Sequence, residues 1–249
     1  MPLLFKYIIS GNLCRRRLHM QGYKPEKQKG NEERLDESLI PEITIQNVVS
    51  TFYLGRKKIN LKEICSKLKY LEFNPHKFAA ATLRLKEPRT TQLIFGSGNV
   101  VCTGGKSLRE SCLACRYCVN IFQRSGLRVG FYNFKIQNIV GSTGIDEPID
   151  LIKLKNDFSV YTSYEPELFP GLVFRLSSPK IVYLLFRSGR IVVTGAKTEA
   201  QLRKYWEGFF KTVLVNYIDF KSNLKCSSEY RFLNTSKDYS CNFFYEALK

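Results

Sequence analysis

The chain contains an internal repeat. When the sequence is shifted by 91 positions, Leu93 falls on Leu184, and the block Leu93–Lys106 matches Leu184–Lys197 without a gap. The same shift aligns Gln46-Asn47-Val48-Val49 with Gln137-Asn138-Ile139-Val140. Two copies of this length are too few and too long for a solenoid. We therefore expect two similar half-domains, residues 41–130 and 131–219, related by an approximate two-fold axis.

Two segments lie outside the repeat, residues 1–40 and 220–249. The first contains a polar stretch from Lys24 to Asp36, and the second shows no clear periodicity. We expect the first to be a largely disordered tail and the second to be a loose extension of unknown structure. The cluster Arg15-Arg16-Arg17 is compatible with a nuclear-localisation or DNA-tethering signal and with a solvated run of charge.

The strands of each copy can be predicted from alternation. In the first copy, Ile43–Leu54 is β-branched and alternating. Phe78–Leu85, Thr91–Phe95 and Val100–Thr103 are short apolar runs separated by Glu87-Pro88 and Gly96-Ser97-Gly98, which indicates an antiparallel meander.

Two helices complete each copy. Leu61–Leu71 carries apolar residues at helical spacing, and a second helix follows the meander. The second helix begins with a capping box, Ser107 with Glu110, which the other copy repeats as Thr198 with Gln201. This order predicts an α+β fold with the helices packed on one face of the sheet.

The second face of that sheet is the main functional clue. Side chains alternate across a strand, so Val48, Ile94 and Val100 belong to the face that the helices cover. The opposite face is also largely apolar, and it lies in a chain with a net charge of +17. An exposed apolar surface on a basic protein favours nucleic acid as the partner. No uncharged apolar run approaches the roughly 18 residues of a membrane span, so we expect no membrane contact.

The eight cysteines do not predict a metal site. A chain of this length does not need disulfides, so reduced thiols are expected. Cys112, Cys115 and Cys118 have the spacing of part of an iron–sulfur motif, but Phe122 stands where the fourth cysteine would be. Helical cysteines that act as small hydrophobic residues are the preferred interpretation. We expect neither a metal nor a cofactor.

Four motifs resemble the core of the TATA-box-binding protein family. They are the repeated QN[IV]V, EPRTTQLIFGSGNVVCTGGK, FKIQNIVGS and SYEPELFPGL, and the resemblance covers roughly residues 41–218. It implies two pseudo-symmetric repeats that form one saddle-shaped, curved antiparallel sheet with helices on the convex face. It further implies a nuclear general transcription initiation factor that binds and bends TATA or A·T-rich promoter DNA through the minor groove and nucleates the pre-initiation complex. Both halves are in one chain, so we expect binding as a monomer.

The residues of the uncovered face fit that chemistry. The minor groove of an A·T pair presents acceptors only, whereas guanine adds an amino donor that a small apolar side chain would leave unpaired. Asn and Thr can donate to the acceptors at the centre. The expected base contacts are Asn47, Val49, Leu93, Val101, Thr103, Asn138, Val140, Leu184, Val192 and Thr194.

Aromatic and basic residues complete the predicted DNA site. Four phenylalanines lie beside turns at strand ends, where a ring can wedge between base steps. They are Phe78, Phe95, Phe169 and Phe186. The candidates for phosphate contacts are Arg84, Arg89, Lys106, Arg175, Lys180, Arg190 and Lys197.

One loop breaks the two-fold symmetry. Before Phe78 the chain reads Asn74-Pro75-His76-Lys77, but before Phe169 it reads Glu165-Pro166-Glu167-Leu168. Exposed carboxylates beside DNA suit a basic protein partner better than phosphate. The resemblance implies that Glu165, Glu167 and Leu168 meet general transcription factor IIB. Transcription factor IIA and the TBP-associated factors are the other partners that it implies.

Two other classes of protein are alternatives. A single-stranded RNA-binding sheet would stack bases on central aromatics, but the aromatics here are paired at strand ends. A base-removing enzyme needs an acid or lysine nucleophile in a pocket, and the only histidines, His19 and His76, belong to no catalytic arrangement. We therefore expect no enzyme activity.

The sequence also departs from the family. Tyr117 and Asn120 stand in the second helix where a strongly basic run is expected, and residues 55–60 hold one residue more than expected. A diverged TBP-related factor for a specialised promoter subset therefore stays open as the alternative.

Overall fold

The computed structural model describes residues 40–219. The predictions for the two tails, including Arg15-Arg16-Arg17, lie outside these residues. The elements of the first repeat are β1 (Thr44–Tyr53), α2 (Leu61–Lys67), β2 (Leu71–Glu72), β3 (Ala80–Leu85), β4 (Thr90–Phe95), β5 (Asn99–Gly105) and α3 (Leu108–Arg124). Those of the second are β6 (Tyr132–Gly144), α4 (Leu151–Asp157), β7 (Thr162–Ser163), β8 (Gly171–Arg175), β9 (Val182–Phe186), β10 (Arg190–Ala196), α5 (Glu199–Thr212) and the 3-10 helix η2 (Leu214–Tyr217). None of these helices is long and apolar enough to cross a membrane.

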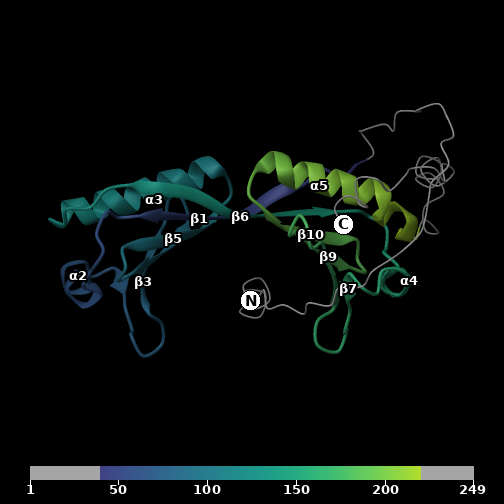
Figure 1. Ribbon diagram of the computed structural model, residues 1–249, viewed down its shortest axis with the longest axis horizontal. Helices are drawn as coiled ribbons and strands as arrows, with labels where there is room; N and C mark the ends of the chain where they lie inside the picture. Colours follow the sequence, from purple (N-terminus) through teal and green to yellow (C-terminus); the bar gives the residue numbers. More distant parts are fainter. Residues whose placement is uncertain (1–39, 220–249) are drawn as a thin grey trace. The chain divides into compact units, whose positions relative to one another are not determined.

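The strands form one antiparallel sheet with a symmetric order. The ten strands run β2-β3-β4-β5-β1-β6-β10-β9-β8-β7, so each repeat contributes one half and the long strands β1 and β6 pair at the centre (Figure 1). Val48 lies opposite Ile139, and these two residues are also equivalent in the repeat. The pseudo-two-fold axis therefore passes between them.

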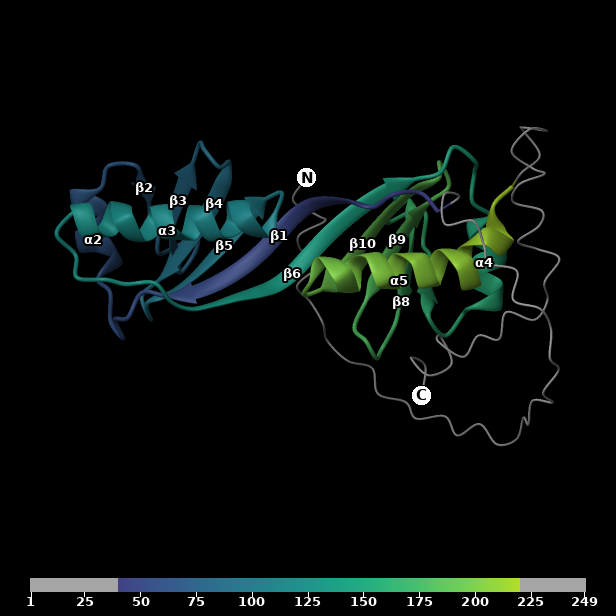
Figure 2. The same ribbon diagram turned by 90° about the horizontal axis from the view of Figure 1, so that it is seen from above.

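Helices α3 and α5 lie on the same side of the sheet, α3 over the half formed by the first repeat and α5 over the half formed by the second (Figures 1 and 2). Both begin as the capping boxes predict. The Ser107 hydroxyl accepts from the Glu110 amide at 3.1 Å, and Thr198 accepts from Gln201 at 3.1 Å. The α+β fold with two repeats, one saddle-shaped antiparallel sheet and helices on the convex face is confirmed.

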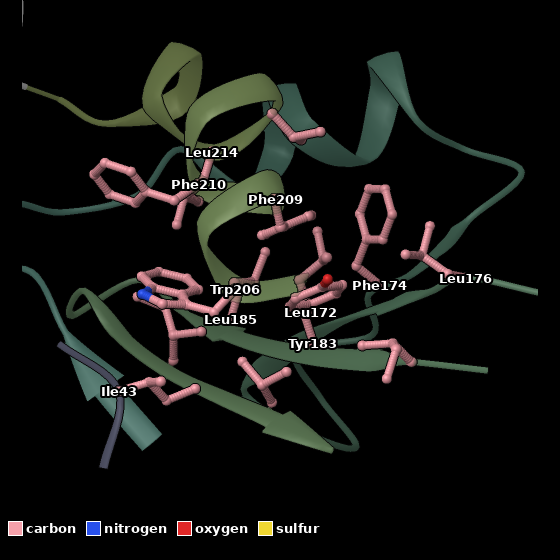
Figure 3. Packing of buried hydrophobic residues seen from close by; sticks show 14 of the residues in the cluster. Ile43, Leu172, Phe174, Leu176, Tyr183, Leu185, Trp206, Phe209, Phe210 and Leu214 are labelled. Atoms are coloured by element: carbon pink, nitrogen blue, oxygen red, sulfur yellow. The ribbon is translucent and has the colours of Figure 1, made fainter. Parts of the chain in front are cut away.

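The two repeats fill equivalent cores with different side chains. In the second repeat, Trp206 and Phe209 of α5 are buried, and the ring of Phe209 stacks on Tyr183 with 3.9 Å between centroids (Figure 3). In the first repeat the equivalent helix residues are Cys115 and Cys118, which are fully buried.

Both buried thiols belong to the hydrophobic core of the first repeat, and Sγ of Cys115 also lies 3.6 Å from the Ser50 hydroxyl. Burial raises the pKa of the Cys118 thiol, which keeps it protonated. Cys112, by contrast, is only partly buried. The interpretation of helical cysteines as small hydrophobic residues is therefore confirmed for Cys115 and Cys118.

The observed elements differ from the predicted ones mainly at the end of α2, at the start of β3 and in two short strands. The helix predicted to reach Leu71 ends at Lys67, because Leu68 is extended, and Leu71 then starts β2. Strand β3 starts at Ala80, since Phe78 closes a turn onto the Asn74 carbonyl at 3.0 Å. The two-residue strands β2 and β7 were not predicted.

We predict that Trp206→Ala destabilises the fold by about 3–5 kcal/mol, because it empties the centre of the second core. Ile152→Ala is the control, since the Ile152 side chain is 67% exposed and its loss should change stability by about 0.5 kcal/mol or less. Urea unfolding of both variants measures the difference. Equal midpoints for Trp206→Ala and the wild type would contradict this description of the core.

Candidate nucleic-acid interface

The sheet face opposite α3 and α5, called the open face below, carries the residues predicted to contact bases. Burial alternates along β1, so that Val48, Ser50 and Phe52 are buried under the helices while Asn47 and Val49 are only partly buried. The same alternation places the whole predicted set on one face: Asn47, Val49, Leu93, Val101, Thr103, Asn138, Val140, Leu184, Val192 and Thr194. Leu184 and Thr194 are buried by their neighbours, and the others are half-buried.

Four of these residues surround the pseudo-two-fold axis. Asn47 lies opposite Val140, and Val49 lies opposite Asn138. The centre of the open face is therefore a quartet in which each amide faces a valine across the β1–β6 pair. Rotation about the axis exchanges the two Asn–Val pairs.

The two central asparagines have fixed amide orientations. The Gly104 N–H donates to Oδ1 of Asn47 at 2.8 Å, and the Gly195 N–H donates to Oδ1 of Asn138 at 2.8 Å. A backbone N–H bonds only to an acceptor, so this contact assigns the oxygen end of each amide. Nδ2 of Asn138 also donates to Oγ1 of Thr194 at 2.9 Å. Each amide thus retains an N–H donor for a further acceptor.

The glycines that hold these amides cannot be replaced freely. Gly195 has φ +110°, and a Cβ there would lie 2.2 Å from the Lys180 carbonyl oxygen. Gly104 has φ +104°, and a Cβ there would lie 3.0 Å from the Arg89 carbonyl oxygen, which is tight but less close than at Gly195. The backbone of Arg89 therefore lies against Gly104, and the backbone of Lys180 lies against Gly195.

The four predicted wedge residues form two pairs. Phe78 and Phe95 have ring centroids 6.2 Å apart, and Phe169 and Phe186 have centroids 5.8 Å apart, with an interplanar angle of 67° in each pair. None of the four belongs to the two hydrophobic cores, and Phe78 is 49% exposed. The rings therefore lie at strand ends outside the cores.

Gly171 makes room for the second pair. A Cβ at this position would lie 2.7 Å from Cε1 of Phe169 and 3.0 Å from Cε1 of Phe186. The equivalent residue of the first repeat is Ala80. The second pair is consequently seated on a glycine, whereas the first pair tolerates a methyl group.

The seven predicted phosphate ligands are all exposed. Arg84 and Arg175 are exposed on β3 and β8, each next to an edge strand of the sheet, and Arg190 is exposed at the start of β10. Arg84 forms an ion pair with Glu72 at 3.4 Å, but both side chains are about two-thirds exposed and the pair contributes little. Arg89, Lys106, Lys180 and Lys197 are exposed in connecting segments.

The acidic loop is exposed between β7 and β8. The Glu165 carbonyl accepts from the amides of Leu168 at 3.0 Å and of Phe169 at 2.9 Å. This turn leaves Leu168 74% exposed and fixes the backbone of the wedge residue next to it. Glu165 and Glu167 are both exposed.

The open face has four members that the sequence analysis missed. Thr82 lies opposite Leu93, and Thr91 lies opposite Thr103. Their equivalents in the second repeat are Val173 and Val182. Strand alternation could have identified them. Each of the four lies two residues from a predicted base contact or opposite one, and side chains two residues apart on a strand point to the same face.

The arrangement defines an α+β protein with two repeats and one sheet face bare of helices. The sequence model of the family described as "Transcription factor TFIID (or TATA-binding protein, TBP)" matches residues 42–125 and 133–214. The TATA-box-binding protein of Tetrahymena thermophila is 45% identical over 186 residues, which cover 75% of this chain and 74% of that protein. That of Acanthamoeba castellanii is 49% identical over 174 residues, covering 70% and 67%.

A solved structure has a similar fold. Methanococcus jannaschii TBP superposes with a TM-score of 0.61 and 35% identity, covering 69% of this chain and 98% of that one. The chain belongs to the TATA-binding protein family. It is a transcription factor of the TBP type, and the family consists of DNA-binding proteins without enzyme activity.

We predict that Gly171→Ala separates Phe169 from Phe186 and costs about 1–3 kcal/mol, because the new methyl group overlaps both rings. The reverse change in the first repeat, Ala80→Gly, should leave the Phe78–Phe95 contact in place. Ring-to-ring NOEs, measured together with thermal unfolding, report both effects. An unchanged Phe169–Phe186 contact in Gly171→Ala would contradict the assigned role of the glycine.

Proposed function

We propose that this protein binds A·T-rich promoter duplexes through the minor groove as a monomer, bends them, and nucleates the initiation complex in the nucleus. The observation that carries the proposal is the central Asn–Val quartet. Its amides have their oxygens engaged and keep a donor, which suits the A N3 and T O2 acceptors of either strand. Its valines offer no acceptor to a guanine amino group, so a G·C pair there would bury an unpaired donor.

The phenylalanine pairs account for bending. A ring at a strand end can enter between two base pairs and unstack them, at a cost of a few kcal/mol per step. The bent duplex then contacts more of the curved sheet, which offsets that cost. The two pairs lie at equivalent places in the two repeats, so we expect one kink at each end of the bound site.

The acidic loop supports a protein partner beside the DNA. Two exposed carboxylates next to an exposed Leu168 offer charge and apolar area to a basic surface. We propose transcription factor IIB as the partner of Glu165, Glu167 and Leu168. We also propose that transcription factor IIA and the TBP-associated factors bind elsewhere on the protein.

We predict one chain per A·T-rich site and a strong salt dependence. If all seven basic residues neutralise phosphates, log Kobs should fall against log salt concentration with a slope of about −6. Fluorescence anisotropy with a labelled duplex, at 50 to 200 mM salt, measures the slope, and analytical ultracentrifugation gives the stoichiometry. A flat salt response, or two chains on each site, would argue against the proposal.

We predict that Phe186→Ala reduces DNA bending more than it reduces stability, because the ring lies outside the core. End-to-end fluorescence transfer on a doubly labelled duplex measures the bend, and urea unfolding measures stability. Phe174→Ala is the control, since Phe174 is 1% exposed and its loss should cost about 3–5 kcal/mol. If Phe186→Ala unfolds like Phe174→Ala and bends DNA normally, the ring is a core residue and no wedge.

We predict that Glu165→Arg combined with Glu167→Arg leaves DNA binding intact or slightly stronger and abolishes the complex with transcription factor IIB. Two reversed charges replace attraction by repulsion, which costs several kcal/mol at an interface. The matched control reverses two exposed carboxylates outside the loop, Asp146→Arg with Glu207→Arg. A gel-shift titration decides the question, and a normal supershift by the loop variant would refute the assignment of this partner surface.

A further inference from the structure

A groove opens on the first repeat at a place that the chain itself occupies in the second. It has a volume of about 200 Å³ and lies between the loop before α2, the end of α3 and the segment that leads to β6. Its floor is apolar, with Ile59, Leu127 and Val129 among the lining residues, and its rim carries Arg56 and Lys58. The groove is separate from the open face and from the acidic loop, so it plays no part in the function proposed above.

The chain itself fills the equivalent place in the second repeat. Ile218 forms an isolated antiparallel bridge with Ile149, just before α4. The Asp150 N–H donates to the Tyr217 carbonyl at 2.8 Å, and the Asp219 N–H donates to the Pro148 carbonyl at 2.9 Å. Tyr217 and Ile218 are both buried by this contact.

The two places correspond residue by residue. Asn60 caps α2 as Asp150 caps α4, and the Ile59 N–H donates to Gly96 O as the Ile149 N–H donates to Arg187 O. Lys58, Ile59 and Asn60 are therefore the counterparts of Pro148, Ile149 and Asp150. One extra residue precedes them in the first repeat, in the loop that carries Arg56.

The first repeat cannot fill its groove in the same way. After α3 the chain must continue into β6, and the Gly130 N–H instead donates to the Leu54 carbonyl at 3.0 Å. Within residues 40–219, the Asn60 N–H and the Lys58 carbonyl form no hydrogen bond. The two backbone groups that hold Tyr217–Asp219 in the second repeat are thus available in the first.

We propose that this groove binds an extended segment of a partner protein, which pairs with Lys58–Asn60 as Tyr217–Asp219 pairs with Pro148–Asp150. The segment needs an aliphatic residue opposite Ile59, in the place that Ile218 takes in the second repeat. Acidic residues should flank it, because Arg56 and Lys58 are exposed at the rim, whereas Glu63 is already paired with Lys67 at 2.9 Å. Both tails of the chain carry more Lys and Arg than Asp and Glu, so charge favours a separate, acidic partner.

The probe for this proposal is a fluorescent peptide with the sequence of residues 214–219 followed by two glutamates. Its binding to the full chain is followed by anisotropy at 50 mM salt. N-methylation of the peptide's Asp amide removes the N–H that would donate to the Lys58 carbonyl, and it should weaken binding at least tenfold. N-methylation of the preceding Ile amide is the control, because in this kind of bridge that N–H points away from the partner strand.

Protein variants locate the binding site. Arg56→Glu with Lys58→Glu should weaken binding at least tenfold, and Lys62→Glu with Lys69→Glu should change it by about twofold or less, since those exposed lysines lie outside the groove. No saturable binding up to 1 mM peptide would overturn the proposal. Equal effects of the two N-methylations, or of the two charge reversals, would overturn it as well.

Discussion

The antiparallel pairing of β1 with β6 is the contact on which the rest of the structure depends. Each repeat alone would have a long strand with an unpaired edge, and the central pair joins both edges into one sheet. The same pair places Asn47 opposite Val140 and Val49 opposite Asn138. The backbone hydrogen bonds between β1 and β6 therefore join the two half-sheets and also bring together the residues at the centre of the proposed DNA site.

The two repeats share a backbone plan but differ in chemistry. The first core uses the thiols of Cys115 and Cys118 where the second uses the large rings of Trp206 and Phe209. Phe78 and Phe95 lie beside an alanine, and Phe169 and Phe186 lie beside a glycine. The seats of the two ring pairs therefore differ between the ends of a nearly symmetric molecule.

Much of this structure could be predicted because the repeat shows the sequence pattern of most helices and strands twice, once in each copy. Alternation assigned Val48 and Ile94 to the covered face, and the capping boxes located the starts of α3 and α5. The end of α2 was missed because Leu68 and Leu71 are buried at helical spacing although the backbone between them turns, with the Leu71 N–H donating to the Leu68 carbonyl at 3.0 Å. Strands β2 and β7 are too short to show any periodicity. The fixing of the Asn47 and Asn138 amides could not be predicted, because it depends on glycine amides 57 residues away.

Substitution of inosine·cytosine for A·T pairs in a bound duplex tests the central claim most directly. Inosine lacks the amino group of guanine, so an inosine·cytosine pair resembles A·T in the minor groove and G·C in the major groove. The account predicts that such a duplex binds about as tightly as the A·T site, whereas the G·C duplex binds at least tenfold more weakly. If the inosine duplex binds as weakly as the G·C duplex, the protein reads the major groove, and the role proposed for the Asn–Val quartet is wrong.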